Sequence, residues 1–373
     1  MKILMSCLSQ SWGGMEMFVL TLTDQLIKRD YECSLVCYPN SKIHTEAKKL
    51  KIKIKKISAK SYFHPLETYK LSSFLKSTKF DVIHTHYSKD LWTLVPALNL
   101  SNNKTPLILT KQMGSYIVKK DFLHKKLYDR VSKVTAISTI IKNNLIETCP
   151  IDESRVKIIF NAVDTTKFDP TKIDREKVRK EFNLSEKEIV IGMSARFTEG
   201  KGHEEFLNAA KILVEKYDNL KFLIVGEPSR GENTYGKKIY DLVEKLGLKK
   251  KVIFTGFRTD MPEMYSAMDI FAFPSHAEAF GIALTEAMSM EKPCVASNAD
   301  GILDIIEDGK NGLFFENKNH FSLKEKLEQL INLASEREQL GKEARKTVIQ
   351  KFELQKITDD FTQLYNTLLI NSK

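Results

Sequence analysis

Short apolar runs alternate with longer amphipathic stretches along the whole chain. The short runs have the length of buried β-strands, and the longer stretches carry apolar residues every three or four positions, which is typical of helices. In the first half this pattern predicts strands over residues 2–7, 32–38, 51–57, 81–84, 106–110, 133–137 and 156–160. The run 51–57 alternates lysine with isoleucine, so one of its faces is expected to be exposed. Helices are expected over residues 17–29 and after Ser138, a residue type that caps helices.

A second series of the same kind follows residues 161–186, a polar stretch that contains Asp169-Pro170 and is expected to be a linker. This series predicts helices over residues 204–217, 235–246 and 281–290 and from residue 323 to the end, and strands over residues 189–194, 220–225, 252–254, 270–273, 293–297 and 312–314. Repeated strand–helix units form parallel sheets with helices on both faces.

The predicted fold is therefore α/β, with two doubly wound, Rossmann-like domains facing a central cleft. We expect one domain over residues 1–165 and a second over residues 166–354. The C-terminal helix, about residues 355–373, is expected to pack back on the first domain. A chain of 373 residues is too long for one hydrophobic core and long enough for two.

The net charge of +10 is concentrated in the first half of the chain. Residues 1–170 contain 27 lysines and arginines against 15 acidic residues, whereas the remainder contains 31 against 33. The first domain is thus expected to meet an anionic partner: nucleic acid, an anionic membrane surface or a phosphorylated acceptor. Solvated surface lysines are the alternative. Nucleic acid is not expected, because the basic half lacks the aromatic pattern of RNA-binding domains.

The sequence also argues against several protein classes. No apolar run reaches the roughly 18 residues of a membrane span, and the N-terminus enters a strand-like run without a signal peptide. The five cysteines are scattered, which fits reduced thiols in a cytoplasmic protein better than a zinc site. Neither Gly-x-Gly-x-x-Gly nor a P-loop is present, and no Asp-x-Asp pair marks a carboxylate-held Mg²⁺. No metal and no cofactor are therefore expected.

Two carboxylates, Glu278 and Glu286, flank a Phe280-Gly281-Ile282 turn directly after the strand-like run that ends before Pro274. Carboxylates accept hydrogen bonds in pairs, as the hydroxyls of a sugar or a ribose require. The turn leads into a helix, whose first N–H groups have no intrahelical partner and can bind a phosphate. This segment could bind both ends of a nucleotide sugar.

The loop after strand 189–194 carries Arg196 and Lys201, with glycines on both sides of the lysine. Its position at the carboxyl edge of the sheet is where such folds bind ligands, and two cations beside a helix start suit a diphosphate. The alternative is a basic loop with solvated side chains. Gly13 and Gly14, in the loop after the first strand, are expected to offer backbone N–H groups to an anion or a sugar oxygen, unless they only form a turn.

Two features of the first domain leave alternatives open. His84 and His86 are two residues apart on an extended segment, so they are expected to point to opposite faces; one could reach the cleft, or both could be structural. Residues 118–131 are expected to form a basic amphipathic helix with Phe122, Leu123 and Leu127 on one side. Such a helix can lie on an anionic membrane or pack on the core with a charged outer face.

Taken together, these motifs resemble glycosyltransferase family 4, the retaining nucleotide-sugar transferases of the GT-B fold. The resemblance runs over nearly the whole chain and is strongest over residues 156–316. It rests on Gly13-Gly14, Asn161-Ala-Val-Asp164 with Phe168, Arg196 with Lys201-Gly202, Gly256-Phe257, Pro274-Ser275, Glu278 with Phe280-Gly281, Glu286-Ala287, Asp300-Gly301, Asp308-Gly309 and Asn311-Gly312.

The resemblance implies a role for each matching position. Arg196 and Lys201 would hold the donor diphosphate and stabilise the leaving group without a metal. Glu278 would bind the donor sugar, Glu286 the ribose, and the backbone of Phe280, Gly281 and Ile282 the phosphate. Gly14 would approach the donor from the other domain.

Two departures from the family pattern concern the same site. Lys111 and Gln112 stand where the family commonly has a histidine, so either could supply the hydrogen bond to the sugar or acceptor. Asp300-Gly301 replaces a Gly-Gly pair and is expected to have less backbone freedom.

We therefore expect a retaining hexosyltransferase that moves a sugar from a nucleotide-diphosphate donor, UDP-sugar favoured, to a hydroxyl of a glycan or lipid-linked acceptor. Lipopolysaccharide or another cell-surface polysaccharide is the expected product, made in the cytoplasm or peripherally at the inner membrane face. The alternatives are a sugar-nucleotide epimerase of the same fold, a phosphorylase, for which no pyridoxal lysine is marked, and a non-catalytic glycan-binding or membrane-adaptor protein.

Overall fold

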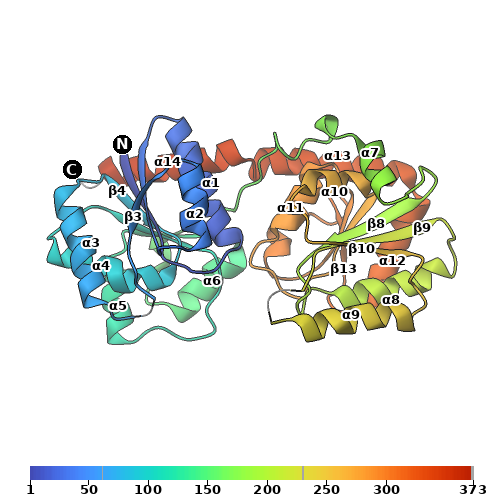
Figure 1. Ribbon diagram of the computed structural model, residues 1–373, viewed down its shortest axis with the longest axis horizontal. Helices are drawn as coiled ribbons and strands as arrows, with labels where there is room; N and C mark the ends of the chain where they lie inside the picture. Colours follow the sequence, from blue (N-terminus) through green and yellow to red (C-terminus); the bar gives the residue numbers. More distant parts are fainter. Residues whose placement is uncertain (61, 229–230, 371–373) are drawn as a thin grey trace. The chain divides into compact units, whose positions relative to one another are not determined.

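The computed structural model describes residues 1–60, 62–228 and 231–370 (Figure 1). The chain divides into two compact units. Unit 1 comprises Met1–Ala162 together with the C-terminal segment from Gln355, and unit 2 comprises Val163–Leu354. The expected α/β class is confirmed, since each unit contains one parallel sheet with alternating helices.

The sheet of unit 1 has seven parallel strands in the order β3-β2-β1-β4-β5-β6-β7. These strands are β1 (Lys2–Cys7), β2 (Glu32–Cys37), β3 (Lys53–Lys56), β4 (Val82–Thr85), β5 (Leu107–Lys111), β6 (Lys133–Ala136) and β7 (Val156–Ile158). Consecutive residues Ile3, Leu4 and Met5 are all fully buried, because helices cover both faces of the sheet (Figure 1). The edge strand β3 is short. Its end residues Lys53 and Lys56 are exposed, whereas Ile54 and Lys55 are both half-buried, so the expected alternation of exposure is not seen.

Helices connect these strands, and two of them begin at side-chain caps, of which the sequence suggests the one at Ser138. The hydroxyl of Ser138 accepts a hydrogen bond from the Ile141 N–H at the start of α6, and Asp121 caps α5. The helices of unit 1 are α1 (Gly14–Lys28), α2 (Lys42–Lys49), α3 (Pro65–Ser77), α4 (Leu91–Leu100), α5 (Phe122–Asp129), α6 (Thr139–Thr148) and α14 (Leu354–Ile370), with 3₁₀ turns η1 (Ser88–Asp90) and η2 (Glu153–Arg155).

Helix α14 joins unit 1 from the far end of the chain. The Phe361 ring packs 6.1 Å from the Phe18 ring of α1, between centroids. Arg29 at the end of α1 donates to Asp359 Oδ1 at 2.5 Å. Helix α14 therefore contacts α1 through an apolar side chain, Phe361, and through a charged side chain, Asp359.

The sheet of unit 2 has six parallel strands in the order β10-β9-β8-β11-β12-β13. These strands are β8 (Ile189–Ser194), β9 (Leu220–Val225), β10 (Val252–Gly256), β11 (Ile270–Phe273), β12 (Cys294–Ser297) and β13 (Leu313–Phe315). The helices are α7 (Arg175–Glu181), α8 (His203–Val214), α9 (Asn233–Lys245), α10 (Met261–Ala267), α11 (Ile282–Ser289), α12 (His320–Asn332) and α13 (Ala334–Lys351), with 3₁₀ turns η3 (Pro170–Lys172) and η4 (Asp300–Asp304). The helical tail expected from residue 323 onwards is made of three helices, α12 to α14.

The expectation of a linker over residues 161–186 is wrong, because residues 163–186 are part of the folded body of unit 2. Phe168 is buried, and Arg179 on α7 is almost wholly buried. Arg179 Nη1 donates to the Ala267 carbonyl at 3.1 Å, and its Nη2 donates to the Glu188 carbonyl at 2.8 Å. The polar side chain of Arg179, in the stretch that suggested a linker, instead donates hydrogen bonds to carbonyl groups at the ends of neighbouring elements.

In both sheets the direction of strand order reverses once. The reversal lies between β1 and β4 in unit 1 and between β8 and β11 in unit 2. Loops at the carboxyl ends of such strand pairs diverge and leave a crevice for ligands. The loops that follow β1, β4, β8 and β11 carry most of the residues singled out from the sequence.

Candidate functional site

In unit 2 the loop after β8 and the loop after β11 are packed into one structure. Gly202, the residue before α8, has φ of +76°, and a Cβ atom there would lie 2.0 Å from the Pro274 carbonyl oxygen. The His276 N–H donates to the Gly200 carbonyl at 2.9 Å and joins the two loops a second time. Glycine is therefore required at position 202 for both its backbone angle and its contact.

These packed loops bring together two of the residues predicted from the sequence. Lys201 Nζ lies 2.5 Å from Glu278 Oε1, and their side chains are only 24% and 18% exposed. A partly enclosed ion pair is screened less by salt than a surface pair. The structure thus places one cation and one sugar-binding candidate in direct contact at the switch point of the sheet.

Arg196 lies on the same loop but outside that ion pair. Its side chain is exposed, and within residues 1–60, 62–228 and 231–370 it has no ion-pair or hydrogen-bond partner. A guanidinium that no protein group neutralises is available to an anionic ligand.

The loop that carries Glu278 is held at several points. Ser297 Oγ donates to the Ser275 carbonyl, Asn317 Nδ2 donates to the His276 carbonyl at 2.8 Å, and the Gly301 N–H donates to the Glu278 carbonyl at 3.0 Å. A Cβ atom at Gly301 would lie 2.5 Å from the Ala279 carbonyl oxygen. Asn317 and Ser297 are bracing residues that gave no sequence signal, because they act through backbone atoms far away along the chain.

Asp300 shows how this chain compensates for the missing glycine at that position. Its φ is +48°, in the left-handed region that aspartate tolerates better than most residues. The backbone therefore adopts here a conformation that glycine reaches without strain, and the glycine that the close contact demands is the next residue, Gly301.

Helix α11 begins at the turn between the two carboxylates. Gly281 has φ of +117° and immediately precedes Ile282, the first residue of the helix. The first N–H groups of a helix lack intrahelical partners and carry its positive end. The Phe280 side chain is buried and lies edge-on to Phe352, so only the backbone of this residue can face a ligand.

Glu286 lies on α11 in an environment that disfavours its charge. The residue is partly accessible, but its carboxyl group is closely surrounded by protein, and this burial raises the pKa of Glu286 to about 7. The Tyr265 hydroxyl donates to Glu286 Oε2 at 3.0 Å, and this bond and the Lys167 charge act in the opposite direction. Tyr265 and Lys167 were not identified from the sequence, since a tyrosine in an apolar helix and a lysine before Phe168 both read as ordinary.

In unit 1 the glycine pair stands at the start of α1. Gly13 caps the helix with an extended backbone, and Gly14 is its first residue. Glu16, in the first helical turn, is buried, and its Oε1 atom has no partner in the part of the chain that the structure describes. This carboxylate was not among the predicted site residues, although the sequence places it three residues after Gly13.

The expectation that His84 and His86 point to opposite faces is wrong. Their ring centroids are 4.2 Å apart, because β4 ends at Thr85 and the alternation of an extended strand stops there. His84 is bonded through both ring nitrogens, to Tyr365 Oη at 2.7 Å and to Thr110 Oγ1 at 2.6 Å. Burial lowers the pKa of His86 to about 3, so this ring is neutral at physiological pH.

Lys111 and Gln112 are both buried at the carboxyl end of β5. Lys111 Nζ donates to Ser88 Oγ at 3.1 Å, and burial, reinforced by the Lys119 charge, lowers the pKa of Lys111 to about 8. The Gln112 Nε2 group is buried without a partner among the described residues. The two residues that depart from the family pattern thus occupy the same edge of the sheet as Glu16 and His86.

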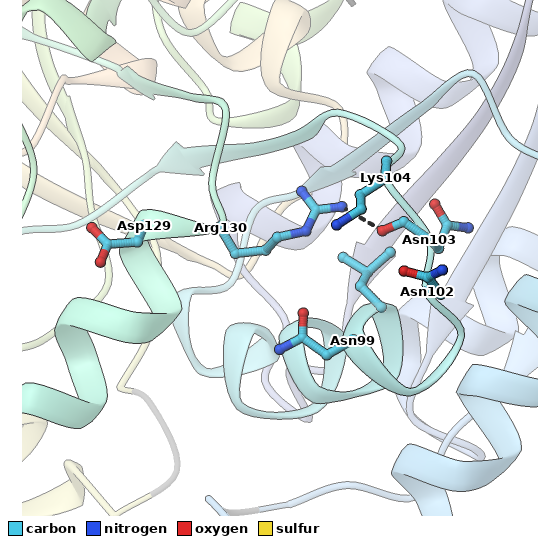
Figure 2. Close-up of a pocket in the computed structure, with 7 residues that line it drawn as sticks. Asn99, Asn102, Asn103, Lys104, Asp129 and Arg130 are labelled. Carbon is cyan, nitrogen blue, oxygen red and sulfur yellow. Dashed lines mark hydrogen bonds between the residues drawn. The ribbon is translucent and has the colours of Figure 1, made fainter.

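A separate pocket lies at the opposite edge of the sheet of unit 1, where β5 begins (Figure 2). Asn99, Asn102, Asn103 and Lys104 line it beside Arg130. Arg130 Nη2 is already committed to the carbonyls of Asn103 and Thr105, at 2.9 and 2.8 Å. Arg130 therefore stabilises the turn before β5, and the two N–H donors of its Nη2 group are already used.

The described residues can be compared with the requirements of a membrane span and of a metal site. No described helix combines the length and apolar character of a membrane span. Within the described ranges, His, Cys, Asp and Glu side chains form no group of three or more that could hold a metal ion.

The chain matches two protein-family models. Residues 12–167 match the model described as Glycosyltransferase Family 4, and residues 174–347 match the model described as Glycosyl transferases group 1. The first model thus covers most of the N-terminal part of unit 1, and the second covers most of unit 2.

Individual proteins with known descriptions are similar over long stretches. The capsular polysaccharide biosynthesis glycosyltransferase CapM of Staphylococcus aureus is 30% identical over 64% of this chain and 63% of its own length. The Escherichia coli UDP-Gal:alpha-D-GlcNAc-diphosphoundecaprenol alpha-1,3-galactosyltransferase is 27% identical over 82% of this chain and 79% of its own. The crystal structure of Anabaena HepE in complex with UDP covers 98% of this chain and 100% of its own with a TM-score of 0.86; at 22% identity this likeness concerns the fold.

Proposed function

The chain belongs to the group 1 glycosyltransferases of family 4, and we propose on that premise that it transfers a sugar from a UDP-sugar to a hydroxyl of a lipid-linked glycan during synthesis of a cell-surface polysaccharide. Homologues that make capsular or other surface glycans support this assignment. The fold is of the GT-B class, with a Rossmann-like sheet in each unit. In this proposal unit 2 binds the donor and unit 1 binds the acceptor.

The Lys201–Glu278 ion pair, with the unpaired Arg196 on the same loop as Lys201, is the observation that carries the proposal. Arg196 and Lys201 provide two positive charges, and the start of α11 adds backbone N–H groups. Together they suit a diphosphate, whose negative charge grows as the bond to the sugar breaks. The same groups would make a metal ion unnecessary.

Donor binding would rearrange the ion pair. Lys201 would turn to the diphosphate, and Glu278 would then accept hydrogen bonds from the sugar hydroxyls. Part of the binding free energy would be used to open the ion pair, and a phosphate would take the place of Glu278 beside Lys201. This exchange favours nucleotide sugars, which offer both groups, over free sugars or free phosphates.

Bond breaking would run ahead of bond formation. The leaving diphosphate would depart on one face of the sugar, and the acceptor hydroxyl would attack from that same face, so the anomeric configuration would be retained. A covalent intermediate is not part of the proposal, because attack from the face of the leaving group retains the configuration without a protein nucleophile.

One relative and one protein of similar fold motivate the choice of donor and acceptor. The E. coli relative bears the name of an enzyme that takes UDP-Gal and a diphosphoundecaprenol-linked sugar, and the Anabaena structure contains UDP. The basic character of the first half of the chain suits the diphosphate of such an acceptor and an anionic membrane surface.

A thermal-shift screen of UDP-, GDP- and ADP-sugars on the full chain tests the donor assignment. Uridine compounds should raise the melting temperature in the presence of EDTA, since a ligand that binds only the folded state stabilises it. Product analysis then separates the alternatives. A sugar-nucleotide epimerase would alter the donor in the absence of any acceptor, whereas the proposed enzyme requires a hydroxyl acceptor and releases UDP.

A further inference from the structure

Large apolar side chains protrude from unit 1 in the segment between β5 and α5. Tyr116 is fully exposed, Ile117 is 71% exposed and Phe122 is 68% exposed. The helix expected over residues 118–131 begins only at Phe122, and Leu127 faces the core while Phe122 and Leu123 face solvent. Exposed apolar side chains of this size in one short segment mark an interaction site.

The exposure of this segment is built into its backbone hydrogen bonding. Asn144 on α6 binds Ser115 at both backbone groups: its Oδ1 accepts from the Ser115 N–H at 2.7 Å, and its Nδ2 donates to the Ser115 carbonyl at 3.0 Å. The Lys119 N–H donates to the Thr148 carbonyl at 2.6 Å. The segment is therefore fixed at both ends, and the side chains between these points are directed outward.

A second segment of unit 1 adds to the same region. Phe63 and Leu66, three residues apart at the start of α3, are 83% and 76% exposed. Neighbouring Tyr62 packs edge-on to Trp92 with centroids 5.2 Å apart, and Trp92 packs in the same way on His124 of α5 at 5.3 Å. Trp92 therefore connects the two segments, and we call Phe63, Leu66, Tyr116, Ile117, Phe122 and Leu123 the docking surface.

Lysines accompany these apolar side chains. Residues 119–126 contain four lysines and one acidic residue, Asp121, whose carboxylate is occupied by the N–H groups of Leu123 and His124 at the start of α5. Lys89 and Lys119 line a pocket between the two segments, together with Tyr62 and Trp92. The surface thus combines protruding apolar groups with an excess of positive charge.

We propose that the docking surface binds an anionic lipid bilayer, with Tyr116, Ile117 and Phe122 inserted below the headgroups and the lysines among the headgroup phosphates. Apolar insertion and lysine–phosphate attraction are the two contributions that bind peripheral proteins to membranes. A second copy of the chain fits less well, because its own lysines would face these lysines. The inference rests on the proposed function, since a lipid-linked acceptor is reached at such a surface.

Vesicle co-sedimentation of the full chain tests this inference. Wild type should bind vesicles of phosphatidylcholine with one quarter phosphatidylglycerol and bind pure phosphatidylcholine vesicles much less. Raising salt to 1 M should weaken binding several-fold, as screening shortens the range of the lysine charges to about 3 Å. The double variant Tyr116→Ser/Ile117→Ser should bind anionic vesicles at least about tenfold more weakly.

A matched control uses apolar residues that are exposed elsewhere. Phe321 on α12 and Ile349 on α13 lie in unit 2, and the double variant Phe321→Ser/Ile349→Ser should bind vesicles like wild type. Equal binding of all three proteins, or no binding of wild type to anionic vesicles, would overturn the inference. Self-association of wild type that the Tyr116→Ser/Ile117→Ser variant abolishes, without vesicle binding, would overturn it in favour of a protein partner.

The variant Lys201→Ala separates this inference from the proposed function. It should bind vesicles like wild type, because Lys201 lies in unit 2. Vesicle binding by a wild-type protein that transfers no sugar would refute the proposed function and leave the docking surface intact.

Discussion

Replacing Glu286 by glutamine should weaken UDP binding and stabilise the free protein at the same time. Glutamine preserves the shape of the side chain and removes its charge. In the free protein that charge is unfavourable, because burial raises the pKa of Glu286 from 4.5 to about 7. With a nucleotide bound, the same charge would accept hydrogen bonds from the ribose hydroxyls. The two effects have opposite signs, which a purely structural glutamate would not show.

The size of the stabilisation follows from the pKa shift. A carboxyl group whose pKa is raised by folding favours the folded state when it is neutral; this contribution is complete below pH 4.5 and is lost as the pH rises through about 7. A shift of this size corresponds to about 3 kcal/mol at pH 8 and about 1 kcal/mol at pH 5. Glu286→Gln should therefore raise the melting temperature of unit 2 by roughly 6–12 °C at pH 8 and far less at pH 5.

The loss of affinity follows from the hydrogen bonds. Two hydroxyls that donate to a carboxylate contribute about 3 kcal/mol together, so the Kd for UDP should rise about 100-fold in Glu286→Gln at pH 8. Below pH 7 the wild-type carboxyl must release a proton before it accepts both bonds. The wild-type Kd should therefore weaken by up to about tenfold per pH unit, whereas the Kd of the variant should not change with pH.

Isothermal titration with UDP between pH 5.5 and 8.5, together with thermal unfolding over the same range, measures both effects. Glu325→Gln, at an exposed position on α12, is the matched control and should leave both quantities unchanged. The reasoning fails if Glu286→Gln binds UDP as wild type does, or if it destabilises the free protein at pH 8.

Three further changes probe the same site. Lys201→Ala should reduce kcat/KM for sugar transfer, measured as UDP release, by at least about 1,000-fold. Its thermal stability should change little, because water can hydrate the Glu278 carboxylate that loses its partner. A variant that keeps one tenth of wild-type turnover would exclude Lys201 from the reaction. Gly202→Ala should destabilise unit 2 by about 2–4 kcal/mol in denaturant unfolding, since its Cβ would overlap the Pro274 carbonyl at a positive φ; an unchanged midpoint would contradict this. Tyr265→Phe removes the hydroxyl that donates to Glu286 and should shift the pH dependence of UDP affinity upward by up to one unit; an unshifted profile would show that this bond does not control the carboxyl.

The sequence predicts the fold well because its signals are local. Buried parallel strands are unbroken apolar runs, and caps such as Ser138 mark helix starts at the correct residue. It fails where a polar residue is used inside the fold: Arg179 lies in a stretch that looks like a linker, yet it is buried against carbonyl groups. The alternation of side chains along a strand likewise predicts the wrong face for His86, because no local signal shows that β4 ends at Thr85.

The site is predictable in its parts and not in its contacts. The loops with Lys201 and Glu278 can be placed at one sheet edge from their positions after strands, but the direct ion pair depends on how two loops 77 residues apart pack together. The sequence does not predict Tyr265 and Glu16 as site residues for a related reason. Each becomes informative only when its neighbours in space are known: a carboxylate for Tyr265, and an unsatisfied buried oxygen for Glu16.

The transfer of a labelled sugar from a UDP-sugar to a diphosphoundecaprenol-linked acceptor, in the presence of EDTA, tests the central claim most directly. Wild type should form a product whose anomeric configuration, determined by NMR, is that of the donor, and Lys201→Ala should form none. The account would be contradicted by an inverted linkage in the product or by transfer by Lys201→Ala at the wild-type rate. It would also be contradicted if the donor changed only in the absence of acceptor.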